Sequence, residues 1–361
     1  MRTSLNIALA ALAGIPSVLA ALTTKEFTTA DGTRYTFDVS PAVTVDDGAT
    51  NTTKPTFLFF HGFPSTRHDW AAQAAALSDA GFGVVVPDLL GFGDSDKPDP
   101  TDLSLYTWRR QSGHISELLE SEKVDKVIGV GHDWGTSALG RAYNYFPAKF
   151  SQLVFLSVGY LYPSGFIDVD AFNAQTLLAS QGTLAQYGYW YFFNHFSTVD
   201  LIESHLESFY SAAYTPDASS QGAELAHLGA ARAWLNANKT MPLASWDSES
   251  HKATWFEKYS APGAVEASLN PYRRAMRGFD VDDGNNAIAL EAKTLNVPVT
   301  LIGGTQDTIS PAAQMSMLTA PFATAGIQEF QLDAGHWVAI EQADAVNDIL
   351  TQLGANATVS A

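Results

Sequence analysis

The chain has 361 residues but no cysteine, and only 20 lysines and arginines stand against 38 aspartates and glutamates. The missing cysteine excludes a disulfide framework, cysteine-ligated zinc and a thiol nucleophile. The formal net charge of −18 disfavours nucleic acid and anionic membranes as partners, because phosphate groups are bound through lysine and arginine. We therefore interpret the acidic surplus as a solvated surface.

Charged residues are also scarce overall. They make up 16% of the sequence, whereas 46% of the residues are hydrophobic. This balance is far from a disordered profile, so a packed core can form. The length allows two domains of about 150 residues, or one large domain with an insertion.

The N-terminus carries an apolar stretch that follows Arg2 and ends at Ala20. The stretch is short of the roughly 20 residues that span a bilayer, and Pro16 interrupts it. We expect residues 1–20 to be a secretory signal peptide, with a membrane anchor as the alternative. Cleavage after Ala20 would remove one positive charge and leave 19 − 38 = −19 on the mature chain.

Three Asn-x-Ser/Thr triplets would suit an exported glycoprotein. They lie at Asn51, Asn238 and Asn356. Such triplets also arise by chance, so the expectation of secretion rests mainly on the N-terminal segment.

Short apolar segments alternate with amphipathic ones along most of the chain. Apolar or β-branched runs that end in turn residues predict buried parallel strands at residues 57–60, 84–86, 126–130, 153–156, 297–302 and 327–332. A half-exposed strand is predicted at residues 34–39. Helices are predicted at residues 69–77, 105–119 and 134–146, and near the C-terminus, where Val346, Ile349, Leu350 and Leu353 share one face. The alternation predicts an α/β fold with a mostly parallel sheet flanked by helices.

The alternation stops between residues 159 and 283. This region is rich in tyrosine, tryptophan, phenylalanine and alanine, and its apolar residues have helical spacing. We predict a helical cap at residues 159–283, inserted between two parts of one core at residues 21–158 and 284–361.

A glycine-flanked aspartate follows the strand predicted at residues 126–130. Residues 131–135 read Gly-His-Asp-Trp-Gly, and a predicted helix begins at Trp134. The pattern is that of a G-x-S-x-G nucleophile elbow with Asp133 at the nucleophile position. Glycines leave room in the sharp turn, and the dipole of the following helix favours the ionised carboxylate.

Two further candidate residues follow later strands. Asp307 lies past the strand at residues 297–302, and His336 lies past the strand at residues 327–332. Nucleophile, acid and histidine appear in the chain order of the α/β-hydrolase fold. Each residue alone could be an ordinary turn or capping residue, but together they predict a triad of Asp133, Asp307 and His336.

A fourth element, Phe-His-Gly-Phe-Pro at residues 60–64, follows the first buried strand. The backbone N–H groups of Phe63 and Trp134 would form an oxyanion hole. His61 could act as a base, but a role in organising this loop through hydrogen bonds is the better interpretation.

These segments together resemble the soluble epoxide hydrolases of the α/β-hydrolase fold. Residues 87–98 (Pro-Asp-Leu-Leu-Gly-Phe-Gly-Asp-Ser-Asp-Lys-Pro) add a match to the loop after the family's fourth strand. The resemblance covers about residues 24–353 and leaves out only the signal region and the tail. It implies an α/β-hydrolase core that carries a lid domain.

The resemblance also implies two tyrosines of the cap that face the nucleophile. Residues 188–193 (Gly-Tyr-Trp-Tyr-Phe-Phe) resemble the family's aromatic cap segment, which assigns one role to Tyr189. Residues 269–273 (Leu-Asn-Pro-Tyr-Arg) match its Asn-x-Tyr-Arg stretch, which assigns the other role to Tyr272. Tyr187 or Tyr191 could replace Tyr189, because an aromatic stripe is usually core packing.

The implied reaction converts a small lipophilic epoxide and water into a vicinal diol. Asp133 would attack an epoxide carbon and form an ester, while Tyr189 and Tyr272 donate hydrogen bonds to the departing alkoxide. His336, oriented by Asp307, would activate the water that hydrolyses this ester. The resemblance implies no metal and no organic cofactor.

Other functions of the same fold are alternatives. Haloalkane dehalogenases share the triad, but they usually place a second halide donor at the position of Phe63, which has no polar hydrogen. The arginine that follows the nucleophile in fluoroacetate dehalogenases is replaced by Trp134, and a serine esterase would need serine in place of Asp133. A pathway-specific epoxide-opening enzyme and a non-catalytic lipophile-binding module complete the alternatives.

Overall fold

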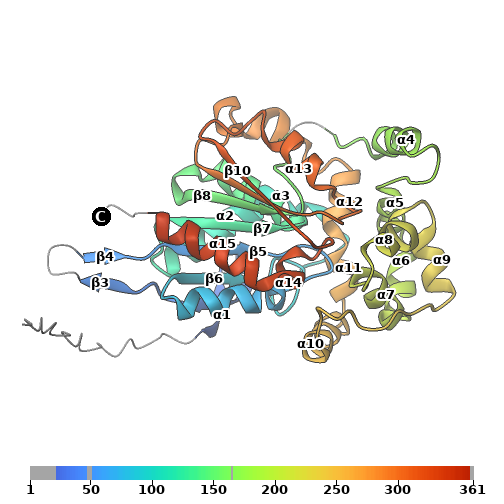
Figure 1. Cartoon of the computed structure of the whole chain (residues 1–361), viewed down its shortest axis with the longest axis horizontal. Helices are drawn as coiled ribbons and strands as arrows, with labels where there is room; N and C mark the ends of the chain where they lie inside the picture. The colour runs from blue at the N-terminus through green and yellow to red at the C-terminus, as the bar shows by residue number, and fades with distance from the viewer. Residues whose placement is uncertain (1–21, 47–50, 164–165, 358–361) are drawn as a thin grey trace, which may run out of the picture.

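A central sheet runs through the computed structural model, which describes residues 22–46, 51–163 and 166–357 (Figure 1). Its strands are β1 (Thr23–Thr28), β2 (Arg34–Ser40), β5 (Thr56–Phe60), β6 (Gly83–Pro87), β7 (Val127–His132), β8 (Phe150–Leu156), β9 (Val299–Gly304) and β10 (Ile327–Leu332). They pair in the order β1-β2-β6-β5-β7-β8-β9-β10. The pairs β1–β2 and β2–β6 are antiparallel, and the pairs from β6 to β10 are parallel. A separate antiparallel pair consists of β3 (Thr44–Asp46) and β4 (Asn51–Thr53).

Alternating side chains bury both faces of the central strands. In β5, Phe57 and Phe59 belong to the hydrophobic core on one face of the sheet. Leu58 and Phe60 belong to the core on the other face, and all four side chains are at most 1% exposed. A strand that is buried on both faces has a continuous apolar sequence, which explains why these strands could be predicted.

Helices cover both faces of the sheet (Figure 1). One core contains residues of α1 (Ala71–Asp79) and α15 (Ala343–Asn356), and the other contains residues of α2 (Trp108–Ser121) and α3 (Trp134–Tyr145). The apolar face expected near the C-terminus is the buried face of α15. Two shorter helices, α13 (Ala312–Thr319) and α14 (Val338–Glu341), follow the last strands.

Two parts of the core differ from the prediction. The helix expected at residues 105–119 begins only at Trp108, because Thr107 has an extended backbone with ψ 146°. Residues 103–106 form a separate 3₁₀ turn before it. The edge strand β1 was not predicted, because its residues are mostly exposed and lack an apolar pattern.

Between β8 and β9 the chain forms helices that stand beyond one end of the sheet (Figure 1). They are α4 (Val169–Ala179), α5 (Gly188–Asn194), α6 (Thr198–Glu203), α7 (Leu206–Ala213), α8 (Ala218–Ser220), α9 (Ala230–Asn236), α10 (Glu249–Tyr259), α11 (Ala264–Ser268) and α12 (Asn270–Met276). We refer to residues 159–283 as the cap. The two boundaries of the cap stay a prediction.

The order of the strands determines where a site can form. β5 pairs with β6 on one side and with β7 on the other. The connection from β5 to β6 therefore runs toward one edge of the sheet, and the connection from β6 to β7 runs toward the other edge. In open α/β sheets, such a point leaves a crevice at the carboxyl ends of the strands. The loops that follow β5 and β7 therefore meet at the crevice, beside the cap.

The structure describes only some of the residues that bear on the prediction of an exported protein. The predicted signal peptide, residues 1–20, lies outside the described residues. Asn51 begins β4, while Asn238 and Asn356 are exposed. None of the described helices has both the length and the apolar character that crossing a membrane requires.

Candidate active site

Asp133 is the single residue between β7 and α3. Its backbone has φ 52° and ψ −124°, which residues other than glycine rarely adopt. A Cβ on Gly135 would lie 2.1 Å from the carbonyl oxygen of Phe60, so only glycine fits at that position. The strained turn places the side chain of Asp133 at the carboxyl end of the sheet, at the start of a helix.

His336 lies between two carboxylates. Its Nδ1 is 2.9 Å from Oδ2 of Asp307, and its Nε2 is 3.5 Å from Oδ2 of Asp133. The other oxygen of Asp307 accepts the backbone N–H groups of Ile309 and Ser310, each at 2.8 Å. Those two hydrogen bonds fix the carboxylate of Asp307, so its free oxygen is held toward His336. The structure thus brings together the three residues of the predicted triad.

The positive charge of His336 and the negative charges of the two aspartates stabilise one another. Burial by itself would lower the pKa of His336, but the carboxylates of Asp307 and Asp133 raise it to about 10. Burial would raise the pKa of Asp133, but the hydrogen bond and the positive charge of His336 hold it below its usual value. At neutral pH the free protein therefore holds an imidazolium between two carboxylates.

The loop after β5 donates a hydrogen bond to Asp133. The backbone N–H of Phe63 lies 2.9 Å from Oδ1 of Asp133, and the backbone N–H of Trp134 helps to lower the pKa of the same carboxyl group. A Cβ on Gly62 would lie 2.5 Å from that Oδ1, so the loop can come this close only with glycine. Two backbone N–H groups directed at one carboxyl group have the arrangement of an oxyanion hole.

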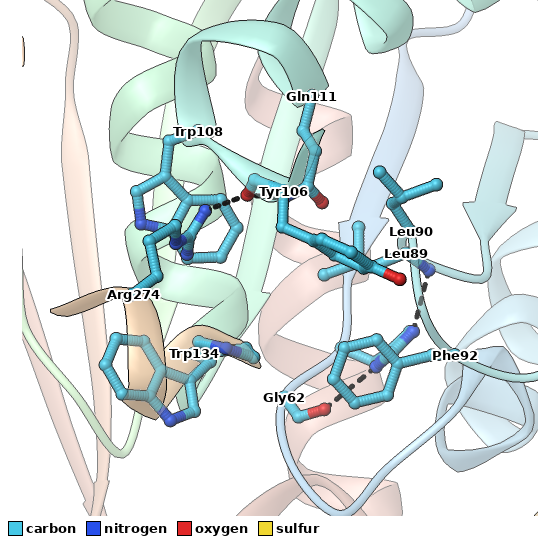
Figure 2. Close-up of a pocket in the computed structure, with 11 residues that line it drawn as sticks. Gly62, Leu89, Leu90, Phe92, Tyr106, Trp108, Gln111, Trp134 and Arg274 are labelled. Carbon is cyan, nitrogen blue, oxygen red and sulfur yellow. Dashed lines mark hydrogen bonds between the residues drawn. The ribbon is translucent and has the colours of Figure 1, made fainter. Parts of the chain in front are cut away.

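His61 organises this loop. Its Nε2 accepts the backbone N–H of Leu89 at 2.9 Å, so its Nδ1 carries the proton and donates to the carbonyl of Gly62 at 3.0 Å (Figure 2). Burial lowers the pKa of His61 and favours the neutral ring. The side chain therefore joins the loops after β5 and β6, in line with the structural role expected for it.

Two buried tyrosines of the cap face the nucleophile. Tyr189 on α5 and Tyr272 on α12 are 6% and 2% exposed, and their ring centroids are 5.7 Å apart. The ring of Tyr272 also packs edge-on against Phe63 at 5.2 Å and Trp134 at 5.0 Å. Burial, together with the negative charge of Asp133, raises the pKa of both phenols well above the usual value. Both tyrosines therefore stay protonated and can donate hydrogen bonds.

The two neighbouring tyrosines of the aromatic stripe have other contacts. Tyr191 is 36% exposed, and its hydroxyl donates to Asp170. Tyr187 packs edge-on against Phe172, at a centroid distance of 5.8 Å. Of these three tyrosines, Tyr189 is the one that packs against the second cap tyrosine in the described structure.

Side chains of the cap also hold two loops of the site. The carbonyl of Pro64 accepts hydrogen bonds from the hydroxyl of Tyr214 at 2.8 Å and from Nε1 of Trp255 at 2.7 Å. A core side chain also donates to the cap, because Nε1 of Trp337 lies 2.7 Å from the carbonyl oxygen of Ala213. Pro64 and Trp337 each directly follow a residue of the candidate site. The cap therefore restrains both the oxyanion-hole loop and the histidine loop.

A partly buried histidine lies between carboxylates of the cap and the core. Nδ1 of His251 is 2.6 Å from Oδ1 of Asp247, and Nε2 is 3.3 Å from Oδ1 of Asp69. The hydroxyls of Tyr210 and Tyr214 donate to the same two carboxylates. Burial would lower the pKa of His251, but the two carboxylates raise it to about 10.

We expect the protein to lose stability as the pH rises from about 6.5 to about 10. A histidine whose pKa is raised by folding stabilises the folded state fully below its unfolded pKa, and this contribution is lost as the pH approaches the folded value. His251 and His336 would each contribute a slope of up to about 1.4 kcal/mol per pH unit. Urea unfolding at a series of pH values measures this slope.

The variant His251→Gln should remove one histidine's share of that slope. His195→Gln, which changes an exposed histidine of the cap, should leave the slope as it is. An unchanged slope in His251→Gln would show that this histidine is not held as an imidazolium in the folded protein.

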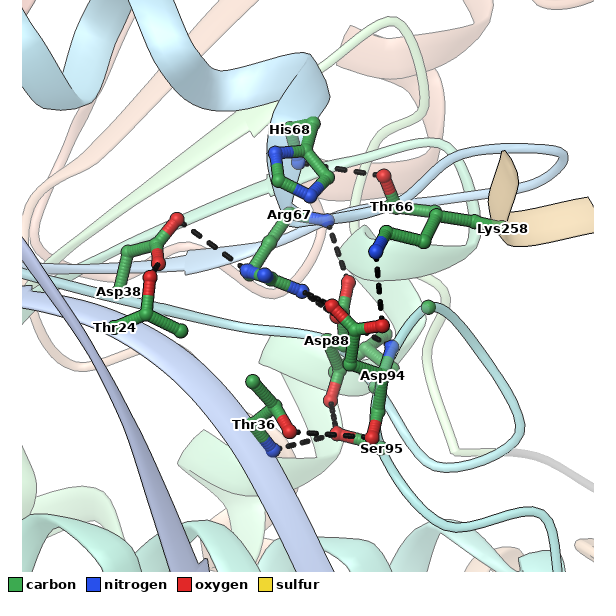
Figure 3. Close-up of polar contacts among 12 residues, drawn as sticks. Thr24, Thr36, Asp38, Thr66, Arg67, His68, Asp88, Asp94, Ser95 and Lys258 are labelled. Carbon is green, nitrogen blue, oxygen red and sulfur yellow. Dashed lines mark hydrogen bonds and ion pairs between the residues drawn. The ribbon is translucent and has the colours of Figure 1, made fainter. Parts of the chain in front are cut away.

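A buried ion network supports the loops from the core side (Figure 3). Arg67 is 6% exposed and pairs with the fully buried Asp88, and its Nη1 lies 2.8 Å from Oδ2 of Asp94. Nζ of Lys258 on α10 lies 2.9 Å from Oδ1 of Asp94. Arg67 therefore links the loops after β5 and β6, and Lys258 links the cap to them. Removing one partner of a buried ion pair typically costs about 3–5 kcal/mol of stability.

Two residues that position His336 were missed in the sequence. The carbonyl of His336 accepts hydrogen bonds from Nε2 of His132 at 2.8 Å and from the hydroxyl of Ser157 at 2.7 Å. Burial and the positive charge of His336 lower the pKa of His132 to about 4, so His132 is a neutral donor. Its place in the elbow was a signal for His132, whereas nothing in the local sequence marks Ser157.

Comparisons with known proteins agree with this architecture. The epoxide hydrolase of Caballeronia sordidicola is 37% identical over 107 residues, which are 30% of this chain and 32% of that protein. The chain therefore matches about a third of the length of that relative. Epoxide hydrolase A of Mycobacterium tuberculosis is 23% identical over 308 residues, with 82% of this chain and 89% of that protein covered.

The fold is also found among solved structures. The crystal structure of epoxide hydrolase A from Mycobacterium thermoresistibile matches with a TM-score of 0.70 at 20% identity, over 92% of this chain and 98% of that one. The resemblance to epoxide hydrolases is thus confirmed, and the chain has their fold. A family model described as "alpha/beta hydrolase fold" matches residues 55–343. The chain therefore belongs to the α/β-hydrolase fold family.

Proposed function

We propose that the protein is an epoxide hydrolase that converts a lipophilic epoxide and water into a vicinal diol through an ester of Asp133. The observation that carries the proposal is the arrangement around Asp133, with an ionised carboxylate beside His336 and two protonated tyrosines opposite. A carboxylate can displace oxygen from an sp³ carbon, and a phenol can protonate the departing oxygen. The names of the relatives support the same activity.

In the first step, Oδ2 of Asp133 would attack a carbon of the epoxide ring. Oδ1 accepts the backbone N–H of Phe63, which leaves Oδ2 as the attacking atom. The ring C–O bond breaks, and Tyr189 or Tyr272 gives its proton to the alkoxide. The product is an ester between Asp133 and a hydroxyalkyl group.

Ester formation would change the charge around His336. An esterified Asp133 no longer carries the negative charge that helps to raise the pKa of His336. The imidazolium can then return a proton to the tyrosinate by way of solvent, and the neutral ring, oriented by Asp307, can take a proton from water. The hydroxide adds to the ester carbonyl, and Phe63 and Trp134 stabilise the oxyanion through their N–H groups. Collapse breaks the bond from the carbonyl carbon to the alkoxy oxygen, which takes a proton from the His336 imidazolium and leaves as the diol. The carboxyl group of Asp133 then gives its proton to His336 and is again a carboxylate.

The side chain of Phe63 argues against dehalogenation. A second halide donor at this position would need a polar hydrogen, whereas the ring of Phe63 packs against Tyr272 at 5.2 Å and Phe193 at 5.0 Å. The side chain of Phe63 therefore shapes the site by packing and donates no hydrogen bond. The donors opposite Asp133 are phenols, which suit a leaving alkoxide that must take up a proton.

Parallel assays with styrene oxide and 1-bromobutane test the proposal. We expect a diol from styrene oxide and no bromide from 1-bromobutane. Bromide release without diol formation would assign the site to dehalogenation. Tight binding of both compounds without any product would assign the protein to the lipophile-binding modules.

The variant Tyr272→Phe should lower the rate of ester formation about 10- to 100-fold. Phenylalanine keeps the ring contacts but removes the phenolic proton, and Tyr189 still supplies one donor. Stopped-flow tryptophan fluorescence on a single turnover measures this step, because Trp134 packs against Tyr272. Tyr191→Phe is the matched control, since Tyr191 is exposed. Equal losses in the two variants would contradict the role given to Tyr272.

We also propose that residues 1–20 are removed and that the protein is secreted as a glycoprotein. The charged and apolar order of the N-terminal segment supports this proposal. Protein secreted by a eukaryotic host should begin at Ala21 and lose mass on treatment with an N-glycosidase. Retention inside the cell with residues 1–20 attached would contradict export.

A further inference from the structure

A small pocket lies next to the candidate active site, between the core and the cap (Figure 2). Its wall includes Gly62 and Trp134, which both adjoin Asp133. Its volume is about 10 Å³, enough for roughly one water-sized group. The pocket can therefore hold one small polar group.

Arg274 of α12 lines this pocket and has no role in the proposed reaction. Its side chain is 1% exposed, and its guanidinium carbon lies 3.9 Å from the centre of the Trp108 ring. Nη1 donates to the carbonyl of Tyr106, and Nε lies 3.2 Å from Oδ2 of Asp280. Nη2 has no hydrogen-bond partner among the described residues, and Nε has only this ion-pair contact. A buried donor without an acceptor is costly, so Nη2 marks a place for an acceptor.

The charges around Arg274 do not fully compensate for the burial of its guanidinium. Burial lowers the pKa of Arg274, and Asp280 and Asp283 oppose that effect only in part. Arg141 adds a second positive charge nearby, which lowers the pKa of Arg274 further. An oxygen acceptor at Nη2 would complete the hydrogen bonding of the guanidinium, and a charged one would also stabilise the buried cation.

We propose that Arg274 binds an oxygen acceptor, a carbonyl or carboxylate oxygen, carried by the substrate. The inference rests on the proposed function, because it takes the bound molecule to be the epoxide. Tyr272 lies two residues before Arg274 on α12 and packs against Trp134, which lines the pocket together with Arg274. A substrate that extends past Gly62 and Trp134, which line the pocket and adjoin Asp133, would place its epoxide at Asp133 and a second oxygen near Arg274. The substrate class is then an epoxide with a carbonyl or carboxylate group, and not a plain hydrocarbon epoxide.

The neighbouring Arg273 offers a matched control. It is also buried, at 6% exposed, but it does not line the pocket. Its Nη1 lies 3.7 Å from Oε1 of Glu266, and its Nε has no hydrogen-bond partner among the described residues, so the two arginines differ in whether they line the pocket. Replacing either arginine by methionine keeps an unbranched side chain and removes one buried cation, so the two variants differ mainly in the site that they change.

Binding of unreactive compounds tests the proposal without any turnover. We would titrate the protein with phenylalkanoates from phenylacetate to 5-phenylpentanoate, with their methyl esters, and with alkylbenzenes of matched length. Tryptophan fluorescence reports binding, because Trp108 and Trp134 line the pocket. At one chain length, the carboxylate or the ester should bind at least about tenfold more tightly than the matched alkylbenzene.

The arginine variants decide which residue causes this preference. In Arg274→Met, the preference for the oxygen-bearing compound should fall to about twofold or less, and Arg273→Met should keep it. Arg274→Lys should keep part of the preference, because it retains a cation without the planar fork. A carboxylate that binds more tightly than its ester would identify a charged acceptor, and equal affinities would identify a carbonyl.

Two results would overturn the proposal. One is a wild-type protein in which no oxygen-bearing compound exceeds its alkylbenzene at any length, and this result needs no folded variant. The other is a preference that survives in Arg274→Met. Because these titrations measure binding alone, a failure here leaves diol formation from styrene oxide untouched, and a failure of diol formation leaves the titrations interpretable.

Discussion

The Asp133→Ala variant should lose at least about 10⁴-fold in kcat/KM on styrene oxide. Alanine removes the atom that forms the new bond, and no described carboxylate can replace it at the elbow. Asp307 is the other carboxylate beside His336, but its oxygens are taken up by His336 and by two backbone N–H groups. Steady-state diol formation, with circular dichroism to confirm folding, measures the loss.

Asp125→Ala is the matched control for this experiment. Asp125 is an exposed aspartate just before β7, at the opposite end of the same strand. Its variant should retain the parental activity, because it lies at the amino end of the sheet, away from the site. If Asp133→Ala kept more than about a tenth of the parental rate, the covalent mechanism would be wrong.

The His336→Gln variant should form the ester but fail to hydrolyse it. Asp133 keeps its carboxylate in this variant, so the first step remains possible, whereas no base is left to take a proton from water. Loss of a general base typically slows a step by about 10²- to 10⁴-fold, so kcat should fall by that factor. Mass spectrometry after mixing with styrene oxide should show protein that is heavier by one substrate molecule.

The mass measurement separates this account from simple damage to the site. His195→Gln, a change to an exposed histidine of the cap, should show neither the adduct nor the loss in kcat. A His336→Gln protein that turns over as fast as the parent would contradict the assignment of His336 as the base. So would a slow variant that accumulates no adduct, because the step that has slowed would then be ester formation and not ester hydrolysis.

The sheet and the proximity of Asp133, Asp307 and His336 could be predicted from the sequence for a physical reason. Strands buried on both faces, such as β5, must be apolar throughout, and the sharp turn at Asp133 needs glycine beside it. The edge strand β1 has no such requirement, because it is exposed. The start of α2 depends on the extended backbone of Thr107, which no apolar pattern records.

Contacts across the chain explain what the sequence could not predict. The choice of Tyr189 within its aromatic stripe depends on the packing of α5 against α12. The hydrogen bonds from Tyr214 and Trp255 to Pro64 join the cap to the core over more than 100 residues. Arg274 lies next to a recognised motif, but its missing partner is visible only where α12 meets the residues around Tyr106.

The most direct test of the covalent mechanism is a single turnover in ¹⁸O-labelled water with enzyme in excess over styrene oxide. Water attacks the ester carbonyl in this mechanism, so the diol takes its new oxygen from Asp133 and the label stays on the protein. We predict ¹⁸O in the peptide that contains Asp133 and an unlabelled diol after the first turnover. Label in the diol with none in the protein would mean that water opens the epoxide directly, and would contradict the account.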